Sequence, residues 1–151
     1  MMNEDLSEFL RLLKSHKVDH IIVGSHVLAV YARPRFTEDI DIWVRRSVEN
    51  ALAIASALRE FGFELTDEQA VKLSSGRNMI VLGEAPNRID ILSFLGAPER
   101  EMDFDKALSR AVTANLLGVE VLVLSKQDFI ESKLSAGRPK DLRDAQEVEE
   151  R

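Results

Sequence analysis

The stretch FTEDIDIWV, residues 36–44, places two aspartates inside a run that otherwise has the composition of a β-strand. Strand side chains alternate between the two faces of a sheet, so Asp39 and Asp41 share one face and the isoleucines share the other. The apolar face is the core face. The two carboxylates therefore project from the opposite face, about 6–7 Å apart along the strand, although aspartate is disfavoured in strands.

A second predicted strand, NRIDILSFL at residues 87–95, repeats this pattern: Arg88 and Asp90 share one face, and isoleucines occupy the other. If the two strands are neighbours, Asp90 can join the first two aspartates. Three converging carboxylates need compensating positive charge, which a hard cation such as Mg²⁺ supplies through oxygen ligation. Two such ions about 3.5–4 Å apart can clamp an attacking and a leaving oxygen. The alternative is solvated acids on the polar side of half-buried strands, but the repetition favours metal binding.

The segment IIVGSHVLAVY, residues 21–31, ends a hydrophobic strand in Gly-Ser and then begins a helix. Gly24 permits unusual dihedral angles and close backbone approach. A helix N-terminus offers unpaired N–H groups that suit a phosphate, and the Ser25 hydroxyl can add a hydrogen bond. The alternative is an ordinary turn with Ser25 as the helix N-cap. Its position shortly before the aspartate pair favours phosphate binding.

Interleaved strand and helix patterns predict an α+β (mixed α/β) fold, with a mixed sheet flanked by helices, in a single domain spanning residues 1–151. Helices are expected at 4–16, 26–33, 47–60, 103–110, 125–136 and 140–150. Strands are expected at 19–25, 37–45, 70–74, 78–82 and 87–95, and on both sides of a turn at Gly118.

Composition limits the class of protein. The chain is 45% hydrophobic and 30% charged, as in ordinary soluble globular proteins, and it has no cysteine for disulfides or thiolate metal sites. The net charge of −6 opposes non-specific binding to nucleic acid. The acidic N-terminus and the lack of a long apolar run predict neither a signal peptide nor a membrane span, so we expect a cytoplasmic protein.

Basic residues gather in KLSAGRPKDLRDAQEV, residues 133–148. In an acidic protein this cluster, which includes Lys133, Arg138 and Lys140, can contact a triphosphate or an RNA backbone; a solvated helix end with ion pairs is the alternative. Thr37, just before the aspartate pair, is a further candidate phosphate contact. Trp43 lies on the carboxylate face, where it either stacks on a nucleobase or packs against a neighbouring helix.

GSHVLAVYARPRFTEDIDIWV, residues 24–44, followed by RIDIL, residues 88–92, resembles the nucleotidyltransferase fold of the DNA polymerase β-like superfamily. The shared motif is Gly-Ser at a strand–helix turn, Asp-x-Asp on the next strand, and a third acid on a later strand. The resemblance covers about residues 20–147 and looks closest to small bacterial AbiEii-like and minimal nucleotidyltransferases, some of which are toxins of toxin–antitoxin pairs.

The resemblance implies a catalytic and metal-binding set, Asp39, Asp41 and Asp90, holding Mg²⁺, with two ions expected. It implies nucleotide and phosphate contacts from Gly24, Ser25, Thr37, Lys133, Arg138 and Lys140, and it includes Asp141 and Asp144 as further parts of the site. An acceptor hydroxyl would attack the α-phosphorus of an NTP such as ATP, with Asp90 helping to deprotonate it, and pyrophosphate would leave. The acceptor stays open between RNA, protein and a small molecule, and a cognate protein partner is also implied. The alternatives are a non-catalytic nucleotide- or partner-binding module and a metal-dependent phosphodiesterase.

Overall fold

The computed structural model describes residues 3–32, 39–84 and 88–150. Within these ranges six strands form one mixed sheet in the order β3-β4-β2-β1-β6-β5. The strands are β1 (His20–Val23), β2 (Ile40–Val44), β3 (Met79–Leu82), β4 (Ile89–Leu92), β5 (Val112–Leu116) and β6 (Val119–Val123). The helices are α1 (Asn3–Ser15), α2 (Ser25–Tyr31), α3 (Val48–Phe61), α4 (Asp67–Val71), α5 (Phe104–Arg110), α6 (Lys126–Ala136) and α7 (Pro139–Glu149), with 3₁₀ turns at Lys72–Ser74 and Pro98–Arg100.

The centre of the sheet fixes the positions of the aspartates. Strand β2 runs antiparallel to β1 and parallel to β4, and in this register Asp41 lies opposite Val23 on one side and Asp90 on the other. Facing residues on neighbouring strands project from the same face of a sheet. The two aspartates therefore share a face, as the repeated sequence pattern required.

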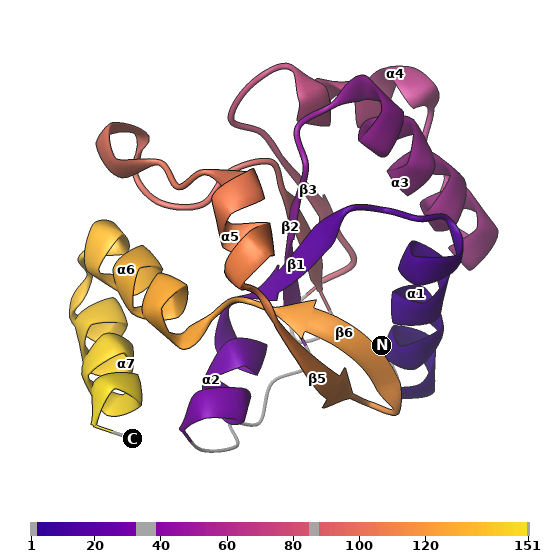
Figure 1. The fold of residues 1–151 in the computed structure, drawn as a ribbon. Coiled ribbons are helices and arrows are strands. Elements are labelled where there is room, and N and C mark those ends of the chain that lie inside the picture. The colour runs from indigo at the N-terminus through magenta and orange to yellow at the C-terminus, as the bar shows by residue number, and fades with distance from the viewer. Residues whose placement is uncertain (1–2, 33–38, 85–87, 151) are drawn as a thin grey trace.

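Helices cover both faces of the sheet (Figure 1): α1, α3 and α4 lie on one side, and α2, α5, α6 and α7 lie on the other. The apolar positions of β2, Ile40 and Ile42, are fully buried, which agrees with the alternation read from the sequence. None of the helices in the described ranges is long and apolar enough to cross a lipid bilayer.

The predicted mixed sheet flanked by helices is confirmed, but the strand predicted at residues 70–74 is wrong. That segment is the end of α4 followed by the 3₁₀ turn. The reason is a capping box: the Thr66 hydroxyl accepts from the Gln69 backbone N–H, and the Gln69 side chain accepts from the Thr66 N–H. The strand predicted at 37–45 is observed from Ile40, and residues 37 and 38 lie outside the described residues.

Candidate active site

The turn between β1 and α2 brings Gly24 against Asp41. Gly24 has φ 77°, and a Cβ at this position would lie 2.2 Å from Oδ2 of Asp41. A side chain is therefore excluded twice, by the left-handed backbone and by the close carboxylate. Helix α2 begins at Ser25 with Gly24 at the cap position and no side-chain cap hydrogen bond, so the alternative of Ser25 as N-cap is wrong.

The aspartates of β2 and β4 form a close pair of like charges. Asp90 is 6% exposed and pairs in register with half-buried Asp41. Burial, followed by the charge of Asp90 and a hydrogen bond shared with it, raises the pKa of Asp41 to about 6. Asp39 precedes β2, and its Oδ1 accepts the backbone N–H of Arg88 at 2.8 Å. Asp41 and Asp90 are therefore neighbours, and Asp39 lies at the start of the same pair of strands, bonded to the backbone of β4's first flanking residue.

Arg88 contacts this acidic group at two further points. Its Nε lies 2.9 Å from Oδ1 of Asp90, and its Nη2 donates to Oδ2 at 3.1 Å. The sequence analysis put Arg88 on the same strand face as Asp90 but did not name it as a site residue. The Arg-x-Asp spacing in a strand was the available signal, because residues two apart project from one face.

The basic cluster is built on two buried acids where α6 turns into α7. Lys133 Nζ lies 3.6 Å from Asp141 Oδ1 and 3.8 Å from Asp144 Oδ2. The guanidinium of Arg138 donates twice to Asp141, at 2.6 Å and 3.3 Å. Burial opposes the ionisation of Asp141, but Arg138 and Lys133 outweigh it and hold its pKa below the ordinary value. These contacts fix the direction of the Lys133 and Arg138 side chains.

The turn, the acids and the basic cluster meet in one cavity of about 320 Å³. Its walls contain Arg88 and eight residues named from the sequence: Gly24, Ser25, Asp39, Asp41, Lys133, Arg138, Lys140 and Asp141. Asp90 lies beside this cavity through its contacts with Asp41 and Arg88. Thr37, the remaining predicted phosphate contact, lies outside the described residues. Segments more than a hundred residues apart in the chain thus supply a single site.

Residues 2–151 match a family described as nucleotidyl transferase of unknown function (DUF2204). The chain belongs to this nucleotidyltransferase family. Two solved structures share the fold. The first is a proposed nucleotidyltransferase from Thermotoga maritima (TM1012), with TM-score 0.62 and 20% identity; the match covers 97% of this chain and 91% of that one. The second is the lincosamide antibiotic adenylyltransferase LnuA in its lincomycin-bound form, with TM-score 0.58 and 14% identity; the match covers 99% of this chain and 97% of that one. No curated protein matches the chain in sequence. The nucleotidyltransferase resemblance read from the sequence is therefore confirmed.

The carboxylates of this nucleotidyltransferase have the chemistry that Mg²⁺ prefers, because they are hard oxygen donors. Oδ1 of Asp90 is buried and accepts no hydrogen bond among the described residues, so its capacity to bind a positive partner is not filled. However, no three acidic or histidine side chains in the described ranges are gathered closely enough to hold a metal ion as they stand. The donor set fits a divalent cation, and the cation would have to share Asp90 with Arg88 or displace it.

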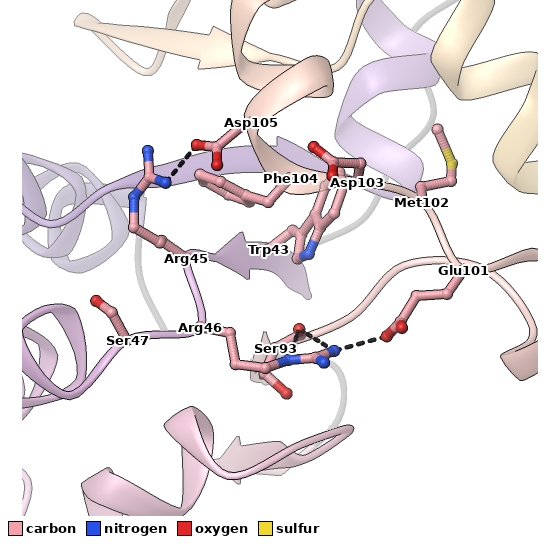
Figure 2. A pocket seen from close by; sticks show the side chains of 10 residues that line it. All are labelled: Trp43, Arg45, Arg46, Ser47, Ser93, Glu101, Met102, Asp103, Phe104 and Asp105. Atoms are coloured by element: carbon pink, nitrogen blue, oxygen red, sulfur yellow. Dashed lines mark hydrogen bonds and ion pairs between the residues drawn. The ribbon is translucent and has the colours of Figure 1, made fainter.

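A larger cavity, of about 550 Å³, opens at the other end of β2 around Trp43 (Figure 2). Trp43 is 1% exposed and packs edge-on against Phe104 of α5, with ring centroids 5.2 Å apart, so the packing alternative for Trp43 is confirmed. The two arginines of this cavity are already engaged: Arg45 pairs with Asp105, and Arg46 pairs with Glu101. The walls of the larger cavity carry three acids and only these two arginines, whereas the smaller cavity carries four basic residues and three acids, so the larger cavity is the poorer binding site for a triphosphate.

His26, in the first turn of α2, contacts the segment that carries the aspartates, although it does not line the cavity. Its Nε2 donates to the backbone carbonyl of Asp39 at 2.9 Å, and burial lowers the pKa of the imidazole. This bond ties the first turn of α2 to the start of β2, which keeps the Gly-Ser turn against the aspartates. A single histidine after Gly-Ser gives no indication in the sequence of a hydrogen bond to the Asp39 carbonyl.

Proposed function

We propose that this nucleotidyltransferase family member moves a nucleoside monophosphate from an NTP to an acceptor hydroxyl in a Mg²⁺-dependent reaction. The observation that supports this is the single cavity in which a glycine turn, two aspartates and a basic cluster meet, with a third aspartate in register beside it. Glycine turns and basic side chains suit phosphates, and aspartates suit the cation that accompanies a nucleotide. The glycine turn and basic side chains would bind the triphosphate, and the aspartates would bind its cation, so both sets are needed to bind a metal-bound triphosphate.

The phosphate half would act by positioning. The backbone at Gly24 can approach a phosphate without a side chain in the way, and the Ser25 hydroxyl can donate to it. Lys133 and Arg138 are oriented by buried Asp141, so they would bind phosphate oxygens with little loss of side-chain freedom. Lys140 adds a third positive charge to the same wall.

The acidic half would hold the cation and accept a proton. Asp39, Asp41 and Asp90 would bind Mg²⁺, with two ions proposed; when bound, Mg²⁺ neutralises the carboxylates and stabilises the charge on the phosphates. Asp90 would accept the proton of the acceptor hydroxyl. The oxygen of that hydroxyl forms a bond to the α-phosphorus, the bond to the bridging oxygen breaks, and pyrophosphate leaves.

For the acceptor we favour a small molecule with a free hydroxyl over RNA or protein. The net charge of −6 opposes binding to an RNA backbone. A structural neighbour of matching length, LnuA, was solved with lincomycin bound and is a lincosamide adenylyltransferase. That protein shows that this fold can act on a small molecule without a much longer chain.

The test incubates the protein with Mg²⁺ and each α-³²P-labelled NTP, adding in turn total RNA, a protein fraction and a small-molecule extract. We expect label in one fraction only, from α-labelled but not γ-labelled NTP, and none with Asp41→Ala. Label in RNA or in protein would replace the small-molecule acceptor and favour a toxin-like role. Equal labelling by Asp41→Ala, or cleavage of nucleic acid without NTP, would overturn the proposal.

A further inference from the structure

Arg88 holds two of the three aspartates by two different groups. Its backbone N–H donates to Asp39, and its guanidinium lies against Asp90. The backbone contact fixes where β4 begins, whereas the guanidinium sits at the end of a long and flexible side chain. The first contact is part of the fold, and the second can be broken without moving the strand.

The guanidinium and the Asp90 carboxylate have opposite charges and lie close together, but Nε and Oδ1 are not aligned for a hydrogen bond. Arg88 Nε and Asp90 Oδ1 lie 2.9 Å apart, yet both atoms are buried and neither makes an aligned hydrogen bond within the described ranges. Buried polar atoms are normally paired with good geometry, and an unaligned pair gains less than an aligned one. Each atom can therefore improve its environment with another partner: a cation for the carboxylate and a phosphate for the guanidinium.

A second partner for Arg88 is within the same cavity. The Arg88 side chain is 41% exposed, compared with 9% for that of Asp90, and it lines the cavity together with Lys133, Arg138 and Lys140. An arginine presents a planar fork that matches phosphate oxygens at two points. A triphosphate in this cavity would lie between Lys133 and Arg138, which Asp141 orients, and the movable guanidinium of Arg88.

We propose that Arg88 is an internal counter-ion, which covers Asp90 in the metal-free protein and transfers to the nucleotide phosphates when a divalent cation and a nucleotide bind together. This inference rests on the proposed function. A cation and a guanidinium compete for Asp90 because both are positive, and a triphosphate relieves the competition by attracting the guanidinium. Nucleotide should therefore raise the affinity for the cation, and the cation should raise the affinity for nucleotide by the same factor.

The test measures Mn²⁺ binding by electron paramagnetic resonance, with and without a non-hydrolysable α,β-methylene ATP, for the wild type and Arg88→Met. For the wild type we expect weak binding of Mn²⁺ alone and binding tighter by about fivefold or more with the ATP analogue. Arg88→Met should bind Mn²⁺ alone several-fold more tightly than the wild type, and the analogue should enhance that binding less. Arg138→Met is the charge control, because it removes a positive charge from the same cavity without uncovering Asp90, and it should raise Mn²⁺ affinity much less.

The results separate this inference from the proposed function. If the wild type binds Mn²⁺ with the analogue and transfers label, but Arg88→Met binds Mn²⁺ alone no more tightly than the wild type, only the counter-ion role is overturned. If neither protein binds Mn²⁺ under any condition, the proposed function fails as well. Should Arg88→Met not fold by circular dichroism, Arg88→Gln takes its place; it is polar but uncharged, so it also removes the positive charge beside Asp90, and it must show the same gain in Mn²⁺ affinity for the inference to stand.

Discussion

Asp41 and Asp90 lie in register on neighbouring strands, so removing one charge should stabilise the metal-free protein at neutral pH. The change we consider is Asp41→Asn, which keeps the size of the side chain and removes its charge. Burial and the neighbouring carboxylate raise the pKa of Asp41 to about 6. The folded state therefore disfavours the ionised form, and the substitution removes that penalty.

The size of the effect follows from the pKa. An ordinary aspartate has a pKa of 3.8, and the rise to about 6 corresponds to about 3 kcal/mol, at about 1.4 kcal/mol per pKa unit. Solvent screening of a half-buried group and the loss of carboxylate hydrogen bonds reduce the gain, so we expect roughly 1–3 kcal/mol. For a chain of this length that is about 3–10 °C in Tm.

The effect has a defined dependence on pH. Between pH 3.8 and about 6 the folded state binds more protons at Asp41 than the unfolded state does. Wild-type stability therefore falls as the pH rises through this window, and the loss is complete above it. The gain from Asp41→Asn should be near zero below the window and largest above it.

The assay is urea unfolding followed by circular dichroism in EDTA, at several pH values across the window and above it. Asp67→Asn is the control, because Asp67 is an exposed acid in the first turn of α4 and its loss should give no gain at any pH. Saturating Mg²⁺ should reduce the difference in the free energy of unfolding between wild type and Asp41→Asn, since the cation offsets the repulsion between Asp41 and Asp90. A variant less stable than wild type at neutral pH, or a gain independent of pH, would show that the charge of Asp41 is not disfavoured.

Three further changes test other parts of the site. Gly24→Ala should lower Tm and abolish ATP binding in a thermal-shift assay, because its Cβ would meet Asp41; Gly62→Ala, at φ 114° with open space around it, should lower Tm alone. Lys133→Met should cost about 2–3 kcal/mol at pH 7 in urea unfolding, and less at pH 4, because it removes the positive charge that lies beside two buried acids, Asp141 and Asp144; an equal cost at both pH values would contradict this. Trp43→Phe should cost about 1–2 kcal/mol and leave ATP affinity unchanged by calorimetry, because Trp43 is a packing residue; a large loss of affinity would place it in the site.

The local pattern around the aspartates could be predicted because it depends on strand geometry alone. Alternation in FTEDIDIWV and RIDIL assigns each side chain to a face without knowledge of the fold. The neighbouring positions of β2 and β4 could not be obtained in this way, since β3 and two helices separate them in the chain. The sequence analysis could state that Asp90 joins the pair only if the strands are neighbours.

Two features were missed for different physical reasons. The capping box of Thr66 and Gln69 was visible in the sequence, but it was not recognised as the start of a helix, and residues 70–74 were assigned to a strand. The contact between Arg88 and Asp90 was not visible, because a strand pattern fixes the face of a side chain and not its rotamer or its partner. Side-chain ion pairs of this kind need the coordinates.

The charges around the cavity explain why a cation and a nucleotide would be bound together. Its walls carry three carboxylates, with a fourth, that of Asp90, beside them, and four basic groups: Asp39, Asp41 and Asp141, and Arg88, Lys133, Arg138 and Lys140. A free triphosphate is attracted by the basic groups but repelled by the aspartates. A free cation is attracted by the acids but repelled by the basic groups, so neither ion alone is strongly attracted to the cavity. A nucleotide with its cation matches both signs at once. An acidic protein can in this way select a metal-bound nucleotide without presenting a positive surface to nucleic acids.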